Sequence, residues 1–173
     1  GYSLDMPARF QLMASMNPCP CGFLGHPSRA CVDSPMAVQR YQQKVSGPFM
    51  DRMDLVIGVQ PAKPEELDAR APSESSELIR ARISRARRRQ RERLGETGPR
   101  CNAEIGAAPQ ALERYLPLAP DARQLLRVLA RRRELSPRAQ HRLRRVARTL
   151  MDLDPNESEA IEGPISRVAM AKA

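Results

Sequence analysis

Three cysteines, a histidine and an aspartate lie close together near the start of the chain. Cys19 and Cys21 are separated by one residue, nine residues separate Cys21 from Cys31, and His26 and Asp33 could add a further ligand atom. Thiolates with a histidine or a carboxylate form tetrahedral zinc sites, although paired cysteines usually have two to four residues between them. C-x-x-C redox spacing is absent, so a zinc site and a structural loop without metal are the alternatives.

Asn17 stands directly before this stretch, at the end of a short buried strand expected over residues 9–17. Pro18 cannot donate to a sheet and keeps the residue before it extended. An amide at the carboxyl end of a core strand in an α/β sheet lies where ligands bind, so it could orient a water or bind a γ-phosphate. The alternative, which the local pattern alone favours, is an asparagine that caps an Asn-Pro turn.

Arg52 lies in the stretch PFMDRMDL, on an expected exposed turn just before a second short strand over residues 55–59. A guanidinium there could cross a subunit boundary and neutralise charge that develops on a neighbour's γ-phosphate. The alternative is a local salt bridge to Asp51 or Asp54. The two interpretations are compatible, because those carboxylates would also hold the arginine in place.

Arginines dominate residues 77–94, which carry only a narrow apolar stripe. A helix covered by arginine can lie along phosphates and give salt-dependent affinity for nucleic acid of any sequence. Aromatic residues are not interleaved with the arginines, so base stacking is not expected. The alternative is a solvated charged surface. The candidate nucleic-acid contacts are Arg80, Arg87, Arg88 and Arg91.

Helices are expected over much of the remaining chain. One helix should begin at Ser34 and Pro35, because serine caps a helix and proline fits its first turn, and it should end at Gly47 and Pro48. After a polar segment rich in proline, glutamate and serine, the apolar spacing predicts helices alone. Their ranges are 77–94, 120–135, 136–154 and about 164–172.

The chain therefore divides into an α/β part over residues 1–62, a linker over 63–76 and an all-helical part over 77–173. Two strands are too few for an independent sheet, so an upstream part of the first domain is expected to be missing. No apolar run approaches the roughly 20 residues of a membrane helix. The start lacks a secretion signal, and four unevenly spaced cysteines favour a reducing cytoplasm, with Cys101 as a small packed residue.

The net charge of the chain indicates which class of binding partner to expect. Lys and Arg outnumber Asp and Glu by 29 to 20, which gives a net charge of +9. This balance favours an anionic partner, such as nucleic acid, a nucleotide or an acidic protein surface, and does not choose among them.

Three longer stretches carry a common pattern: FQLMASMNPCPCGFLGHPSRAC, VQRYQQKVSGPFMDRMDL and LSPRAQHRLRRVARTLMDL. Together they resemble the magnesium-chelatase-like AAA+ ATPases, in the branch similar to the bacterial competence-associated branch-migration helicase. The resemblance covers nearly the whole chain. It implies the C-terminal part of an AAA+ P-loop-type α/β core, followed by an all-helical lid. The phosphate loop G-x-x-x-x-G-K-[ST] is absent from these residues, so the chain alone is not expected to hydrolyse ATP.

The resemblance also implies roles for single residues. Asn17 matches the sensor 1 position, Arg52 matches the arginine finger, and Arg138 matches the sensor 2 arginine that reaches nucleotide bound in its own subunit. Arg142 and Arg145 share the helical face of Arg138 and are further candidates. In the full-length context the implied cofactors are ATP and Mg²⁺, and the implied partners are the upstream ATPase half, a homo-oligomeric ring, expected to be a hexamer, and DNA.

The cysteine stretch departs from the family pattern at one position. Relatives commonly carry a second Cys-x-Cys where this chain reads Cys31, Val32 and Asp33. Asp33 or His26 could replace the missing ligand of a Zn²⁺ ion. Because the fourth cysteine is replaced, we favour a structural loop without metal.

Three functions fit this sequence. The first is the sensor, arginine-finger and lid portion of an ATP-dependent AAA+ motor that acts on DNA, in the manner of a branch-migration helicase. The second is a chelatase-type motor that drives metal insertion through a protein partner. The third is a non-catalytic remnant that binds nucleic acid or a partner ring.

Overall fold

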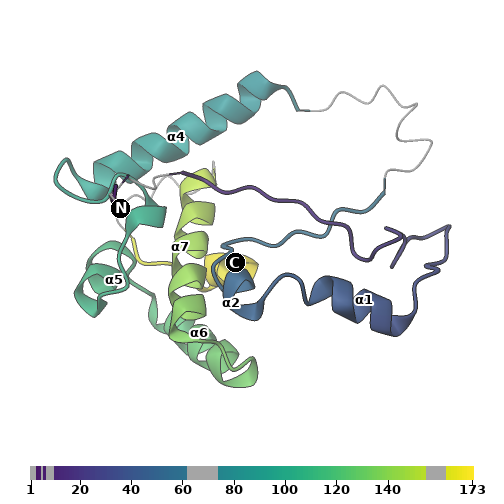
Figure 1. Cartoon of the computed structure of the whole chain (residues 1–173). Coiled ribbons are helices and arrows are strands. Elements are labelled where there is room, and N and C mark those ends of the chain that lie inside the picture. Colours follow the sequence, from purple (N-terminus) through teal and green to yellow (C-terminus); the bar gives the residue numbers. More distant parts are fainter. Residues whose placement is uncertain (1–2, 5, 7–9, 62–73, 155–162) are drawn as a thin grey trace. The chain divides into compact units, whose positions relative to one another are not determined.

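The structure is a computed structural model, and it describes residues 3–4, 6, 10–61, 74–154 and 163–173. Two compact units divide the chain (Figure 1). The first unit comprises Gly1–Met50 and Ile57–Lys63, and the second comprises Asp51–Val56 and Pro64–Ala173. Most of the expected linker over 63–76 lies outside the described residues.

The first unit contains helices α1 (Pro35–Gln42) and α2 (Gly47–Met50). The Ser34 side chain accepts a hydrogen bond from the amide of Ala37, with a proline in the first turn, which confirms the predicted start of α1. The predicted end is wrong, because α1 stops at Gln42 and a separate turn forms at Gly47. Ser46 caps this turn by accepting from the Phe49 amide, and Pro48 is tolerated because it needs no donor in a first turn.

The two expected strands do not form among the described residues. The expected strand over 9–17 is irregular from residue 10 onward, with residue 9 outside the described chain, and residues 55–59 are irregular as well. A strand needs a neighbour to complete its hydrogen-bond ladder, and no described segment pairs with either stretch. Apolar side chains along both remain exposed, with Met13 at 85% and Val59 at 88%. The described residues therefore form helices and no strands, and the expected α/β core is not shown.

The second unit is helical in its described residues, and four of its helices correspond to predicted ranges. They are α4 (Ser76–Leu94), α6 (Pro120–Arg132), α7 (Pro137–Leu153) and α8 (Arg167–Lys172). The predicted start of the helix over 136–154 is confirmed, since Ser136 caps α7 and Pro137 lies in its first turn. The predicted end of the helix over 77–94 is confirmed too: α4 stops at Leu94, before Gly95, whose φ of 72° glycine accommodates without strain. The 3₁₀ turn η1 (Asn102–Glu104) and α5 (Pro109–Tyr115) were not predicted.

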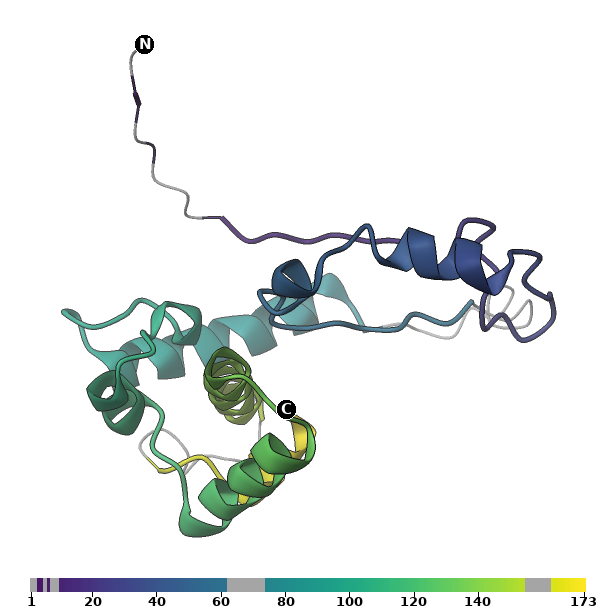
Figure 2. The same cartoon turned by 60° about the horizontal axis from the view of Figure 1, so that its bottom comes forward.

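Helix α7 is the centre of this domain (Figures 1 and 2). It packs against both α4 and α8, and α8 packs in turn against α6. The core is aliphatic, as expected for a chain with few aromatic residues; its most deeply buried members are Leu116, Ala122, Ala147, Ile165 and Met170. The segment before α8 is joined to the segment before α6, because the Ile165 amide donates to the Pro117 carbonyl at 2.7 Å. Across the described residues, every helix is too short or too polar to cross a bilayer.

Candidate functional site

The cysteine stretch folds into a compact loop in which three thiols meet. The Sγ atom of Cys19 lies 3.4 Å from that of Cys21 and 3.6 Å from that of Cys31, and the last two are 3.5 Å apart. The Asp33 carboxylate joins them, since its Oδ2 accepts the Cys21 amide at 2.8 Å and lies 3.6 Å from the Cys31 sulfur. His26 stays outside this cluster, and its Nδ1 accepts the amide of Ser28 instead.

Two glycines give the loop its shape. Gly22 and Gly25 have φ values of 83° and 79°, a region that residues with a Cβ rarely adopt. The Gly22 amide closes a turn on the Cys19 carbonyl at 3.1 Å. Asn17 lies beside this turn, because a Cβ placed on Gly22 would come within 3.8 Å of the Asn17 Nδ2. The sensor candidate and the thiols therefore occupy neighbouring positions.

The loop perturbs its own ionisable groups. The Asp33 amide lowers the pKa of the Cys31 thiol, but desolvation and the adjacent thiols of Cys21 and Cys19 outweigh it and raise this pKa to about 12. Hydrogen bonds from Cys21 hold the pKa of the Asp33 carboxyl below its usual range. The Cys31 thiol therefore holds its proton more tightly than an ordinary cysteine, beside a carboxyl group that loses its proton more readily.

The segment around Arg52 is fixed to α7. The Arg142 Nη1 donates to the carbonyl oxygens of Asp51 at 3.0 Å and Met53 at 2.7 Å, on both sides of Arg52. Asp51 also accepts from the hydroxyl of Ser136 at 3.4 Å. Because its neighbours are anchored, the backbone of Arg52 is held in place while its side chain is exposed.

The candidate arginines of α7 therefore differ in their contacts. Arg138 is exposed in the first turn of the helix. Arg142 contacts the backbone around Arg52, and Arg145 forms an ion pair with Asp54 at 3.7 Å. The sequence indicates Arg142 as a nucleotide contact, and its hydrogen bonds to the backbone on both sides of Arg52 were not predicted.

We expect the Arg142→Ala variant to loosen the segment from Asp51 to Met53. Two hydrogen bonds of about 1 kcal/mol each should be lost, so local opening should rise about tenfold or more. Trypsin cleavage after Arg52, located by mass spectrometry, measures this opening. The matched control is Arg138→Ala, one turn earlier on the same helix, which should leave the cleavage rate unchanged; equal acceleration in both variants would contradict the anchoring role.

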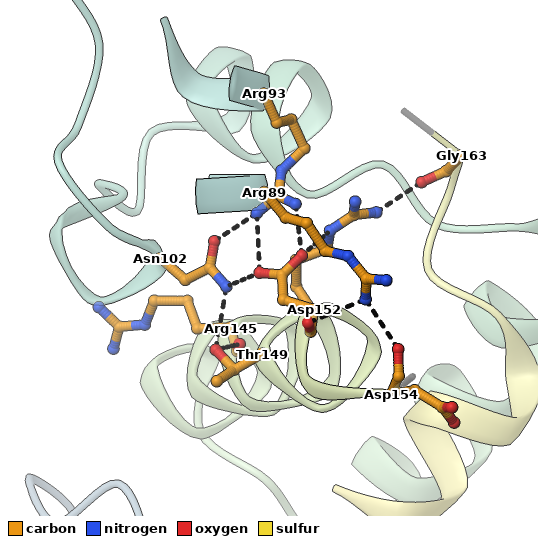
Figure 3. A network of polar contacts seen from close by, with 9 residues as sticks. Arg89, Arg93, Asn102, Arg145, Thr149, Asp152, Asp154 and Gly163 are labelled. Atoms are coloured by element: carbon orange, nitrogen blue, oxygen red, sulfur yellow. Dashed lines mark hydrogen bonds and ion pairs between the residues drawn. The ribbon is translucent and has the colours of Figure 1, made fainter. Parts of the chain in front are cut away.

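A buried polar network joins the C-terminal end of α7 to α4 (Figure 3). The guanidinium of Arg93 donates two hydrogen bonds to the carboxylate of Asp152, at 2.6 and 3.1 Å. Asn102 donates to the same carboxylate at 2.8 Å and accepts from Arg93 at 2.6 Å. Arg148 is fully buried with its Nε 3.4 Å from Asp152, whose side chain is 1% exposed.

The arginines of α4 consequently fall into two groups. Arg93 and Arg89 face the domain interior, where Arg89 donates to the carbonyls of Asp152 at 3.1 Å and Asp154 at 2.7 Å. The remaining group contains the four candidate nucleic-acid contacts, all of which are exposed: Arg80, Arg87, Arg88 and Arg91. The interior position of Arg89 and Arg93 was not predicted. Asp152 is the one acidic residue of α7, four residues after Arg148, but this spacing does not indicate which arginines of α4 face it.

Comparisons with known proteins match most of the chain. The family model described as magnesium chelatase, subunit ChlI, matches residues 1–67, and the one described as magnesium chelatase, subunit ChlI C-terminal, matches residues 73–168. No solved structure matches.

Three curated relatives are each 35% identical to this chain. Competence protein ComM of Haemophilus influenzae aligns over 153 residues, which are 87% of this chain and 28% of the relative. The uncharacterized protein YifB of Escherichia coli aligns over 89% of this chain and 29% of its own length, and the uncharacterized protein Rv2897c of Mycobacterium tuberculosis over 90% and 30%. The chain thus spans less than a third of the length of the curated relatives it matches.

Proposed function

The chain belongs to the magnesium chelatase family, and we propose that it is the sensor, arginine-finger and lid portion of an ATP-dependent AAA+ motor that acts on DNA. The remaining ATPase half, with its phosphate loop, would lie in the part of the longer protein that the relatives possess and this chain does not span. In this proposal the C-terminal part of an α/β core precedes the helical lid, and the exposed apolar segments over 10–17 and 55–59 become strands when that core is complete.

The observation that carries this proposal is the anchoring of Arg52. An arginine finger must present its guanidinium outward from a backbone that does not yield, because its task is to neutralise charge at a fixed place on a neighbour's nucleotide. The carbonyls of Asp51 and Met53 are held by Arg142, and Arg52 itself is exposed. The proposed ring, a hexamer, brings this side chain to the nucleotide of the next subunit.

Other residues serve the nucleotide in the same subunit. Asn17 would orient the attacking water or bind the γ-phosphate, and Arg138 would contact the phosphates when the lid closes. Bound Mg²⁺ would neutralise phosphate charge at this site. Within these roles Arg142 positions the finger and need not touch ATP itself.

The exposed arginines of α4 support DNA as the substrate of the motor. They extend along one helix of a chain with a net charge of +9. Arg88 has an acidic neighbour, Glu92, at 3.9 Å in an exposed pair, and such exposed pairs are too weak to prevent phosphate binding. This arrangement suits sequence-independent binding to a phosphate backbone.

We expect the quadruple variant of these arginines to have a lower DNA affinity and a weaker salt dependence. The variant replaces Arg80, Arg87, Arg88 and Arg91 by glutamine. Fluorescence anisotropy with labelled duplex DNA over a range of salt concentrations measures log K against log[salt], whose slope should flatten by about 0.9 for each phosphate that the variant no longer neutralises.

The matched control makes the same change in charge on α6 and the residue after it, at Arg127, Arg131, Arg132 and Arg133, which lie on a different helix. It should keep most of the slope. Equal reductions in both variants would show that net charge alone attracts DNA. Wild-type protein without measurable affinity would favour the second candidate, a chelatase-type motor for metal insertion, which the descriptions of the matching family models support.

A further inference from the structure

We propose that the loop from Cys19 to Asp33 binds one structural zinc ion through three thiolates and one carboxylate. The ligands are Cys19, Cys21, Cys31 and Asp33, whose candidate ligand atoms all lie within 4.8 Å of one another. This inference does not depend on ATP hydrolysis or on DNA binding. It also reverses the preference that the sequence alone supports, which was a loop without metal.

The arrangement of the sulfurs is that of a metal site. Zinc–sulfur bonds of about 2.3 Å in a tetrahedron place the sulfurs roughly 3.8 Å apart. The three sulfur–sulfur distances of 3.4, 3.6 and 3.5 Å form a nearly equilateral triangle, a few tenths of an ångström tighter. A disulfide would instead bring two sulfurs to about 2.05 Å and leave the third apart. A small outward movement of the thiols is enough to admit the ion.

Asp33 completes the set where a fourth sulfur is absent. Its carboxylate is fixed against the sulfurs by the Cys21 amide at 2.8 Å, and it lies 3.6 Å from the Cys31 sulfur. Hydrogen-bond donors to a ligand, such as the Cys21 amide here, orient metal ligands and tune their basicity. The Leu24 amide, 3.4 Å from the Cys19 sulfur, supplies a further hydrogen bond to a thiolate. His26 lies outside this group of ligand atoms, and its Nδ1 accepts from the amide of Ser28.

The first unit has little apolar core to stabilise it. Among its described residues, only Cys19 is buried, and neither α1 nor α2 buries a side chain. Small units without an apolar core commonly depend on a metal or a disulfide, and metal binding then contributes directly to folding. The cysteines of this loop are not joined by disulfides. A zinc ion would hold together both ends of the loop and, through Gln42, which donates to the Pro18 carbonyl at 3.0 Å, helix α1.

The choice of zinc follows from the ligand types. Soft thiolates select zinc, copper(I) or iron–sulfur clusters, and four-coordinate sulfur-rich sites with one carboxylate oxygen fit zinc. All four ligands come from the protein, so no position remains for a water molecule. The site is therefore structural, and it shapes the loop that carries Asn17.

The test is metal binding by the 173-residue chain and three variants. Wild-type protein prepared in zinc should retain one zinc ion per chain after gel filtration, measured by elemental analysis. Asp33→Ala should weaken zinc binding by at least about tenfold, the scale found for changes near metal ligands. The matched control is His26→Ala, in the same loop, which should bind zinc as the wild type does.

A gain-of-function variant keeps the test informative if Asp33→Ala fails to fold. Asp33→Cys completes four thiolates, and in the cobalt-substituted protein the thiolate-to-cobalt absorption should rise by roughly a third over that of the wild type. Wild-type protein with well under one zinc per chain would overturn the proposal. So would loss of zinc in His26→Ala, or unchanged cobalt spectra in both Asp33 variants.

Discussion

If the proposed function is right, Arg52→Ala in the full-length protein should leave ATP binding as in the wild type and slow ATP hydrolysis about a thousandfold, the scale on which arginine fingers act. In the proposed ring each subunit would keep its own phosphate loop and its own lid, so nucleotide binding would not depend on Arg52. The transition state in the neighbouring subunit would lose one positive charge at the place where negative charge develops. Nucleotide affinity by fluorescence titration and steady-state phosphate release measure the two effects separately.

Mixing experiments distinguish a residue that acts across a subunit boundary from one that acts within its own subunit. Arg52→Ala subunits mixed with phosphate-loop mutants that retain Arg52 should recover part of the activity, because some mixed interfaces carry a working phosphate loop and a working finger. Arg138→Ala should reduce nucleotide affinity or lid closure, and the same partner should not rescue it. Equal rescue of both variants, or of neither, would contradict the two assignments.

Arg142 provides a third arm of this experiment. If it positions the segment around Arg52, as its hydrogen bonds to the carbonyls of Asp51 and Met53 indicate, Arg142→Ala should resemble a milder Arg52→Ala and be rescued by mixing. If it contacts nucleotide in its own subunit, it should resemble Arg138→Ala. The outcome therefore decides between a positioning role and the nucleotide-binding role that its place in the sequence suggested.

Local chemistry explains which elements could be predicted from the sequence. The starts of α1 and α7 follow from a serine cap and a proline in the first turn, which act within a few residues. The expected strands over 9–17 and 55–59 depend on pairing with other segments, so their apolar composition alone could not decide their structure. Helix α5 was missed because its short span, Pro109–Tyr115, carries too few apolar positions for a periodic pattern.

In the candidate sites, too, the features set by neighbouring residues could be predicted and those that depend on distant residues could not. The tight spacing of Cys19 and Cys21 argues against an ordinary zinc knuckle, and only the fold shows that Cys31 and Asp33 return to them. The arginines of α4 could not be sorted from their spacing, because arginine occupies interior and exterior positions alike. Arg93 faces the interior because it pairs with the carboxylate of Asp152, 59 residues further along the chain. A partner at that separation cannot be detected from the spacing of residues within α4.

Replacement of Asp152 by alanine should cost about 3–5 kcal/mol in the free energy of unfolding, the range found when one member of a buried ion pair is removed. The carboxylate is contacted by Arg93, Arg148 and Asn102. Without it, Arg148 and Asn102 stay buried and the Arg93 side chain stays largely covered. A domain of this size has a stability of only about 5–15 kcal/mol. Urea denaturation, followed by far-ultraviolet circular dichroism, should therefore show a much lower midpoint. Glu92→Gln, which alters an exposed pair on α4, is the matched control and should leave the midpoint nearly unchanged.

A double-mutant cycle then tests whether Arg93 and Asp152 act as a pair. Once Asp152 is alanine, removing Arg93 as well should cost far less than removing Arg93 from the wild type, with a coupling energy of about 0.5–3 kcal/mol. The double variant should remain less stable than the wild type, because Arg148 has no exposed surface and keeps its charge inside the domain. Additive effects would mean that the two side chains stabilise the fold independently. A wild-type midpoint in Asp152→Ala would mean that the junction of α4 and α7 rests on apolar packing alone.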